Sequence, residues 1–148
     1  MIALIQRVNF AQVAVGERVV GRIDRGLLAL IGVQAADSAA SATRLLERVL
    51  GYRVFPDDEG RMNRSLAETG GGLLLVPQFT LAADTRKGAR AGFSMAAAPD
   101  AAASLFNGFV ADARARHPTV ATGEFGAHMR VALENDGPVT FWLEAHAS

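Results

Sequence analysis

Two continuous apolar segments constrain the fold of this chain more than any other feature. Residues 26–33 read GLLALIGV, and residues 73–81 read LLLVPQFTL after three consecutive glycines. An uninterrupted apolar run of this length is typical of a strand that is buried on both faces of a sheet. Both runs are far shorter than the ~20 residues that cross a membrane. The sequence therefore predicts an internal sheet that is covered on its two sides.

Size and composition narrow the class of protein. The chain has 148 residues, of which 50% are hydrophobic and 20% charged, so one core can support residues 1–148 as a single domain. Fifteen Lys and Arg balance fifteen Asp and Glu, which argues against coating of long nucleic acids but leaves room for binding of a nucleic-acid end. Cysteine is absent, which excludes disulfides, zinc–thiolate sites and a cysteine nucleophile. We expect a cytoplasmic protein without a membrane span, whose N-terminus forms a strand and not a signal peptide.

The periodicity of apolar residues predicts two helices and six to eight strands. One helix is expected from Asp37 or Ser38 to about Gly51, and the other from Pro99 to about His117. Residues 56–65 are expected to form a polar loop, and 135–138 a turn. The predicted class is α+β, with a curled, barrel-like, mostly antiparallel β core and two helices packed on one side. Strands are expected at residues 1–8, 12–15, 19–23, 26–33, 52–55, 73–81, 128–134 and 139–145.

Searches for conventional catalytic motifs find none. The three histidines, His117, His128 and His146, have no metal-ligand spacing, so we expect surface residues and no metal site. No G-x-S-x-G elbow, phosphate-binding loop or dinucleotide-binding fingerprint is present. The adjacent carboxylates of residues 57–59 are best interpreted as solvated charge. The sequence predicts neither a metal nor an organic cofactor.

Two segments carry polar residues at positions where the surrounding sequence pattern makes such residue types unusual. Residues 77–81 place Gln78 and Thr80 where an apolar strand emerges, which suits either a ligand site or a strand end. Residues 135–140 read NDGPVT, which suits a hairpin turn, or a rigid carbonyl rim if the bond before Pro138 is cis. Taken alone, each segment leaves both interpretations open.

Seven motifs together resemble the D-aminoacyl-tRNA deacylases, in their order and spacing and over almost the whole chain. They are Gln6-Arg7-Val8, GLLALIGV, RVFPDDEGRMNRS, QFTL, KGAR-x-x-F, TGEFGAHMRV and NDGPVT.

The resemblance implies hydrolysis of the ester between a D-amino acid and the 3′ end of tRNA, by a homodimer with active sites at the subunit interface. Gln78, Phe79 and Thr80 match the family's active-site segment. Gly137 and Pro138 match its Gly-cisPro motif, which enters the partner's site. Arg7 matches the arginine that fixes this motif, and Phe125 and Met129 match positions near the pocket for the terminal adenosine.

Two departures from the family pattern stand out. Pro77 replaces the usual serine, and residues 90–93 read RAGF where the family has Arg-Pro-Ser-Phe. The loss of a hydroxyl at position 77 keeps open an alternative, a catalytically silent module that binds RNA ends or nucleotides on the same fold. The cations Arg86, Lys87 and Arg90 suit tRNA phosphates and a merely solvated loop equally well.

Overall fold

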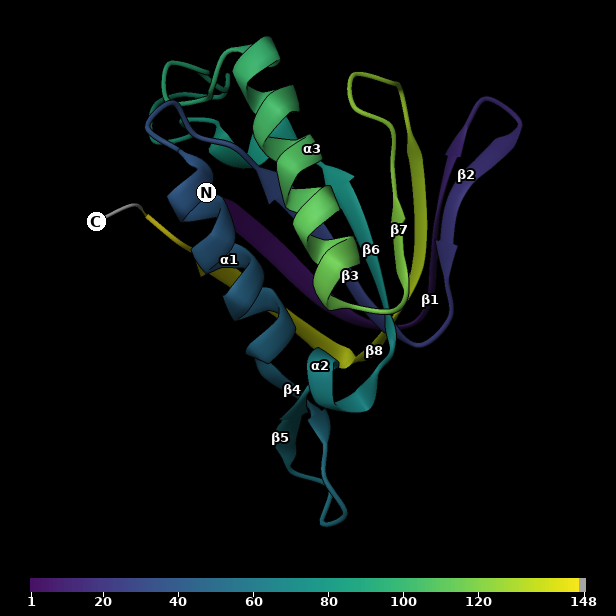
Figure 1. Ribbon diagram of the computed structural model, residues 1–148. Helices are drawn as coiled ribbons and strands as arrows, with labels where there is room; N and C mark the ends of the chain where they lie inside the picture. Colours follow the sequence, from purple (N-terminus) through teal and green to yellow (C-terminus); the bar gives the residue numbers. More distant parts are fainter. Residues whose placement is uncertain (147–148) are drawn as a thin grey trace.

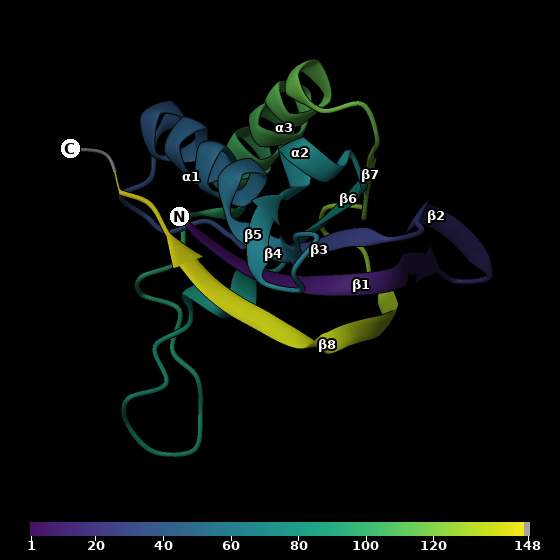
Figure 2. The same ribbon diagram turned by 90° about the horizontal axis from the view of Figure 1, so that it is seen from below.

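The computed structural model describes residues 1–146, which form a curled sheet with the helices on one side (Figure 1). In Figure 2 both long helices lie above the sheet, while the last strand passes below it. Among the described residues, no helix is long and apolar enough to span a membrane. The elements are β1 (Ile2–Val15), β2 (Arg18–Ile23), β3 (Gly26–Gly32), α1 (Ala39–Gly51), β4 (Arg53–Pro56), β5 (Met62–Ser65), α2 (Leu66–Thr69), β6 (Gly72–Pro77), the 3-10 helix η1 (Phe79–Ala82), α3 (Pro99–Arg116), β7 (Val120–Thr122) and β8 (Arg130–Glu144).

The main sheet is mixed and nearly closed, which confirms the predicted α+β class with a barrel-like core. Its order is β2–β1–β3–β6–β7, and β8 pairs with β1. Strand β1 runs antiparallel to β2, β3 and β8, whereas β3–β6 and β6–β7 are parallel pairs. Strand β2 approaches β7 so closely that a Cβ on Gly21 would lie 2.4 Å from the carbonyl oxygen of Thr122. This contact brings the two ends of the sheet together.

The two apolar runs form β3 and β6, and each faces a separate core on either side. Leu27 and Leu73 contribute to the core beneath the helices, whereas Leu28 and Leu74 contribute to the core inside the curl. All four side chains are at most 1% exposed. Because neighbouring residues of a strand point to opposite faces, both faces require apolar side chains, as the sequence predicted.

The two long helices also agree with their predictions. Helix α1 begins after Ser38, whose backbone N–H donates to Ser41 Oγ over 2.9 Å, and it ends at Gly51. Helix α3 has Pro99 in its first turn, where a missing N–H costs nothing, and two arginines in its last turn. The apolar stripes of both helices pack on the same face of the sheet.

Residues 56–69 hold more structure than expected. The predicted polar loop contains β5, which pairs with β4, and the short helix α2 follows it, so residues 1–146 contain three α-helices and not two. Helix α2 has a capping box, in which Ser65 Oγ accepts from the backbone N–H of Glu68 and Glu68 Oε1 accepts from Ser65. Gly70 ends the helix with φ at 72°. This capping pattern was a usable signal in the sequence.

Three further expectations were wrong in detail. The strand at 73–81 ends at Pro77, and residues 79–82 form a 3-10 helix, because pairing with β7 ends at Leu75 and the N–H of Gln78 makes the last bond to β3. Residues 135–138 form no hairpin turn, since β8 continues through them. His117 is 4% exposed and not a surface residue, because its Nε2 lies 2.6 Å from the carbonyl oxygen of Gly71 and joins α3 to β6.

A pair of glycine substitutions tests the close contact between β3 and β6. A Cβ on Gly26 would lie 1.9 Å from the carbonyl oxygen of Gly72, so Gly26→Ala must move a central strand. We expect it to lower the free energy of unfolding by about 3 kcal/mol, measured by urea denaturation. The control is Gly108→Ala in α3, where an added Cβ would have no atom within 4 Å. The higher helix propensity of alanine should raise the free energy of unfolding by about 0.5–1 kcal/mol. Equal effects of the two substitutions would contradict this packing.

Candidate functional site

The polar segment after β6 leaves the sheet as a tight turn. Gln78 donates its backbone N–H to the carbonyl oxygen of Ile31 over 2.8 Å, which is the last bond of the parallel ladder. The chain then enters η1, in which Leu81 donates to Gln78 over 3.3 Å. Phe79 and Thr80 begin this turn, and the first N–H groups of a helical turn have no partner within it. These two N–H groups are therefore available to a ligand.

A cavity of about 690 Å³ opens beside this turn, and we call it the aromatic cavity. This volume suits a small ligand or one nucleotide-sized group. Phe79 is 62% exposed, and its ring centroid lies 5.3 Å from that of Phe93. The residues that line the aromatic cavity come from β6, η1, the loop before α3, the first turns of α3, the segment leading into β8 and the start of β8: Val76, Pro77, Gln78, Phe79, Phe93, Ala96, Ala97, Ala98, Pro99, Ala102, Phe125, Gly126, Ala127, His128, Met129 and Val131.

The structure brings together four of the predicted site residues in this cavity: Gln78, Phe79, Phe125 and Met129. Thr80 lies beside it, and the side-chain amide of Gln78 donates to Thr80 Oγ1. Phe93, His128 and residues 96–99 also line the cavity and were not predicted from the sequence as site residues. Two signals for Phe93 were available in the sequence: it is an aromatic residue in an otherwise polar loop, and it ends the KGAR-x-x-F motif.

The remaining predicted residues form a second cluster on β1 and β8. The Arg7 guanidinium donates from Nη1 to the carbonyl oxygen of Val54 over 2.7 Å and from Nε to that of Asp136 over 3.2 Å. The Gly137–Pro138 peptide bond is cis, as the resemblance implied, and Gly137 lies against the Arg7 guanidinium. This cluster shares no residue with the aromatic cavity of the same chain.

A basic loop connects η1 to α3 and projects from the body of the fold (Figure 2). Asp84 and Gly92 pair at its base, with reciprocal backbone bonds of 2.7 and 2.9 Å. Two bonds of 2.9 Å join the Arg86 guanidinium to the Asp84 carboxylate, and they lower the pKa of Asp84 to about 2. Lys87 and Arg90 make no hydrogen bond or ion pair with the described residues. The loop thus presents two uncompensated cations near the aromatic cavity, because Phe93 at its end is part of the wall.

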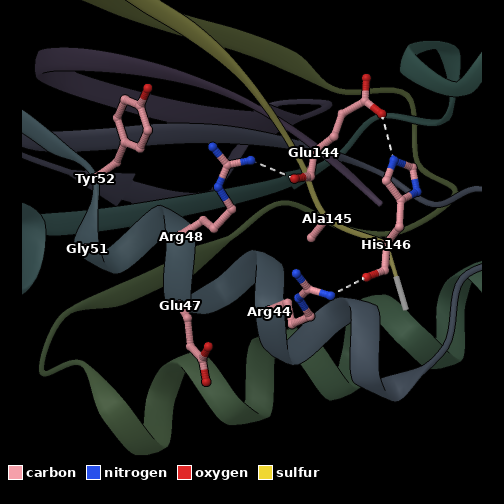
Figure 3. Close-up of a pocket in the computed structure, with 8 residues that line it drawn as sticks. All are labelled: Arg44, Glu47, Arg48, Gly51, Tyr52, Glu144, Ala145 and His146. Atoms are coloured by element: carbon pink, nitrogen blue, oxygen red, sulfur yellow. Dashed lines mark hydrogen bonds and ion pairs between the residues drawn. The ribbon is translucent and has the colours of Figure 1, made fainter. Parts of the chain in front are cut away.

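A second hollow, of about 730 Å³, lies between α1 and the end of β8 (Figure 3). Its polar groups bond mainly to one another. Arg48 donates to the carbonyl oxygen of Glu144 over 2.6 Å, Arg44 donates to that of His146 over 2.9 Å, and the His146 ring lies 3.1 Å from the Glu144 carboxylate. These contacts connect the helix to the last strand and converge on no common point. We therefore take the aromatic cavity as the candidate functional site.

No three His, Asp or Glu side chains gather closely enough to hold a metal ion within residues 1–146. The groups that the aromatic cavity offers are aromatic faces, an amide, a hydroxyl and backbone N–H donors. Aromatic faces stack on nucleic-acid bases, and paired N–H donors stabilise an oxyanion. This combination suits a substrate that contains both a base and a carbonyl group.

Comparisons of sequence identify the family. The family described as D-Tyr-tRNA(Tyr) deacylase matches residues 4–144. The D-aminoacyl-tRNA deacylase of Thioalkalivibrio sulfidiphilus is 65% identical over 144 residues, which are 97% of this chain and 97% of that protein. The D-aminoacyl-tRNA deacylase of Alkalilimnicola ehrlichii is 63% identical over 148 residues, which are 100% and 99% of the two chains.

Two solved structures share the fold. The one titled c-Myc DNA Unwinding Element Binding Protein has a TM-score of 0.95 and 34% identity, covering 99% of this chain and 100% of that chain. The one of a probable eukaryotic D-amino acid tRNA deacylase has a TM-score of 0.83 and 20% identity, covering 97% and 98%. Because the family matches residues 4–144 and the relatives match nearly the whole length, the chain belongs to the D-aminoacyl-tRNA deacylases, which hydrolyse the ester between a D-amino acid and tRNA.

Proposed function

We propose that this deacylase removes D-amino acids, and glycine, from the 3′ end of tRNA as chiral proofreading in the cytoplasm. The aromatic cavity supports this proposal best, since one wall can stack a terminal adenosine while the adjoining turn presents free N–H groups. Phe125 and Met129 would contact the adenosine. Gln78, Phe79 and Thr80 would face the ester.

The reaction needs no strong protein nucleophile, because an aminoacyl ester is already activated. The oxygen of a water molecule attacks the ester carbonyl carbon, the bond to the ribose oxygen breaks, and the water proton passes to that oxygen. The neighbouring 2′-hydroxyl of the ribose assists this transfer. The N–H groups of Phe79 and Thr80 stabilise the developing oxyanion.

Thr80 acts as a positioning residue in this mechanism. Its hydroxyl accepts a hydrogen bond from Gln78, and no described His or Lys is hydrogen-bonded to it. A threonine nucleophile requires an adjacent base to take its proton. Water is therefore the better candidate.

Selection against L-amino acids would come from Gly137 and Pro138 of the partner subunit in a homodimer. Their carbonyl groups would hold the substrate's α-amino group, so that an L side chain collides with the rim while glycine, which has no Cβ, passes.

The lining of the aromatic cavity supports a contribution from the partner. Gln78 follows the ladder at Ile31, opposite Ala3, whereas Gly137 lies beside the side chain of Arg7 on β1. Neither Gly137 nor Pro138 lines the cavity of its own chain, so the motif is free to enter the cavity of a partner.

The alternative is a module that binds nucleic-acid ends without catalysis. The solved structure at 34% identity carries the name of a DNA-binding protein, which favours nucleic-acid binding by this fold. The deacylases at 65% and 63% identity favour catalysis.

A hydrolysis assay with matched substrates tests the proposed function. We expect release of D-tyrosine from D-Tyr-tRNA and of glycine from Gly-tRNA, with L-Tyr-tRNA spared by at least about a hundredfold in kcat/KM, because one steric clash of about 2.7 kcal/mol suffices. Thr80→Ala should keep measurable activity. Binding without turnover would support the module, and a trapped acyl-enzyme on Thr80 would contradict the water mechanism.

The basic loop should contact the phosphates of the tRNA acceptor stem. We expect Lys87→Ala/Arg90→Ala to lower kcat/KM on full-length D-Tyr-tRNA by about tenfold at low salt. The slope of log(kcat/KM) against the logarithm of the salt concentration should become shallower by about 1 for each phosphate that the loop no longer neutralises. D-tyrosyl-adenosine, which lacks the stem, should react at the unchanged rate.

The control for the loop is Arg114→Ala, since Arg114 is an exposed cation near the end of α3 that likewise has no hydrogen bond or ion pair within residues 1–146. At 1.5 Å per residue it lies about 22 Å from Pro99 at the cavity. Equal losses of activity for Arg114→Ala and the loop variant would show that only general charge matters.

Substitutions of Pro77 test whether hydrolysis needs the serine hydroxyl that the family usually has at this position. Leu73 donates its N–H toward β7 and Gln78 donates toward β3, so the nitrogen of residue 77 faces the β7 side, where strand pairing has ended at Leu75. Proline is tolerated there. Pro77→Ser should change D-Tyr-tRNA hydrolysis by less than about tenfold, or about 1.4 kcal/mol of barrier. Pro77→Ala is the matched control for ring removal, and a hundredfold gain with serine alone would show that this chain lacks a catalytic group.

A further inference from the structure

A large bulge in β8 presents the Gly137–Pro138 motif. Gln6 pairs with Thr140, and Val8 pairs with Asn135. From the first of these pairs to the second, β1 advances by two residues and β8 by five. The extra residues form a loop that leaves the ladder, so the backbone groups around it need other partners.

The side-chain amide of Asn135 supplies two of these bonds. Its Nδ2 donates to the carbonyl oxygen of Arg7 over 2.8 Å and to that of Val139 over 3.0 Å. Arg7 is the β1 residue opposite the bulge, and Val139 lies at its far end. Asn135 therefore joins the two sides of the bulge across its neck, and its Oδ1 also accepts from Thr140 Oγ1 over 3.4 Å.

Asp136 provides a second restraint on the same loop. Its Oδ2 lies 3.1 Å from Arg7 Nε, and its backbone carbonyl oxygen also accepts from that nitrogen. Arg7 is only 12% exposed and also donates to the carbonyl oxygen of Val54 on β4. A Cβ on Gly137 would lie 3.2 Å from Arg7 Nη2, so the guanidinium forms one side of the space that the motif occupies.

We propose that Asn135 and Asp136 are positioning residues that determine how strictly the enzyme rejects L-amino acids. This inference rests on the proposed function, in which the Gly137–Pro138 carbonyls form the chiral rim. A rim excludes one enantiomer only if its atoms hold their position, because a shift of about 1 Å in a catalytic contact can cost a hundredfold in rate. Asn135 holds the ends of the rim together, and Asp136 orients the arginine beneath it.

The decisive measurement is the ratio of kcat/KM for D-Tyr-tRNA to that for L-Tyr-tRNA. We expect Asn135→Ala to lower this ratio by at least about tenfold, since the variant lacks two hydrogen bonds to backbone carbonyls. Asp136→Asn, which keeps the shape and removes the charge, should lower it by a smaller factor. Melting temperature and dimer content are measured on the same samples.

Asn9→Ala is the matched control. Asn9 also joins β1 to β8, since its Nδ2 donates to Glu134 Oε1 over 2.7 Å, but it is exposed and lies at the adjoining register shift between Val8 and Phe10, not opposite Gly137 and Pro138. Its removal should leave the D/L ratio unchanged. If Asn135→Ala fails to fold, Asn135→Ser takes its place, because a serine hydroxyl has one donor and cannot bond to both carbonyls.

Pro138→Ala separates this inference from the proposed function. If Pro138→Ala lowers the D/L ratio and both Asn135→Ala and Asp136→Asn leave it unchanged, the positioning role is overturned while the chiral rim stands. If Asn135→Ala slows both substrates by the same factor, Asn135 serves stability alone and the inference is again overturned. If Pro138→Ala itself leaves the ratio unchanged, the rim proposal fails.

Discussion

Strand β1 hydrogen-bonds to three other strands, and the positions of both the aromatic cavity and the Gly137–Pro138 bulge depend on it. Its first half pairs with β3 and its second half with β2, while β8 follows almost its whole length on the other edge. Through β3 it supports β6, whose end presents Gln78 to the aromatic cavity. Through β8 it supports the bulge at Gly137. The relative position of the cavity and the bulge is therefore determined by the register in which β1 pairs with β3 and with β8.

The two functional elements are stabilised by different forces. The aromatic cavity lies at the edge of a sheet whose strands are buried on both faces, so apolar packing holds its walls in place. In the bulge, polar side chains replace the missing ladder bonds. The largely buried Arg7 guanidinium keeps three polar partners, which offset the cost of its burial.

Several elements were predictable because local patterns determine them. The continuous apolar runs predicted β3 and β6, and the apolar stripes with Ser38 and Pro99 predicted α1 and α3. Gln78, Phe79, Phe125 and Met129 were predicted through resemblance to the family and meet in one cavity. The bulge was not predictable, because Asn135 to Pro138 also suit a hairpin turn and only pairing with β1 selects the bulge. Burial of His117 depends on Gly71, 46 residues earlier in the chain.

The sequence by itself determined which segments are buried, where the long helices begin and end, and which residue types are available for chemistry. Burial follows from apolar periodicity and helix ends from capping, and both act over a few residues. Only the tertiary structure decided that Phe93 and Phe79 share a wall, that Asp84 neutralises Arg86 and leaves Lys87 and Arg90 uncompensated, and that Asn135 closes a bulge. These outcomes depend on contacts between residues distant in the chain or on a loop's folded shape, and no local pattern specifies either, because the free energy of such contacts is gained only when the whole sheet forms.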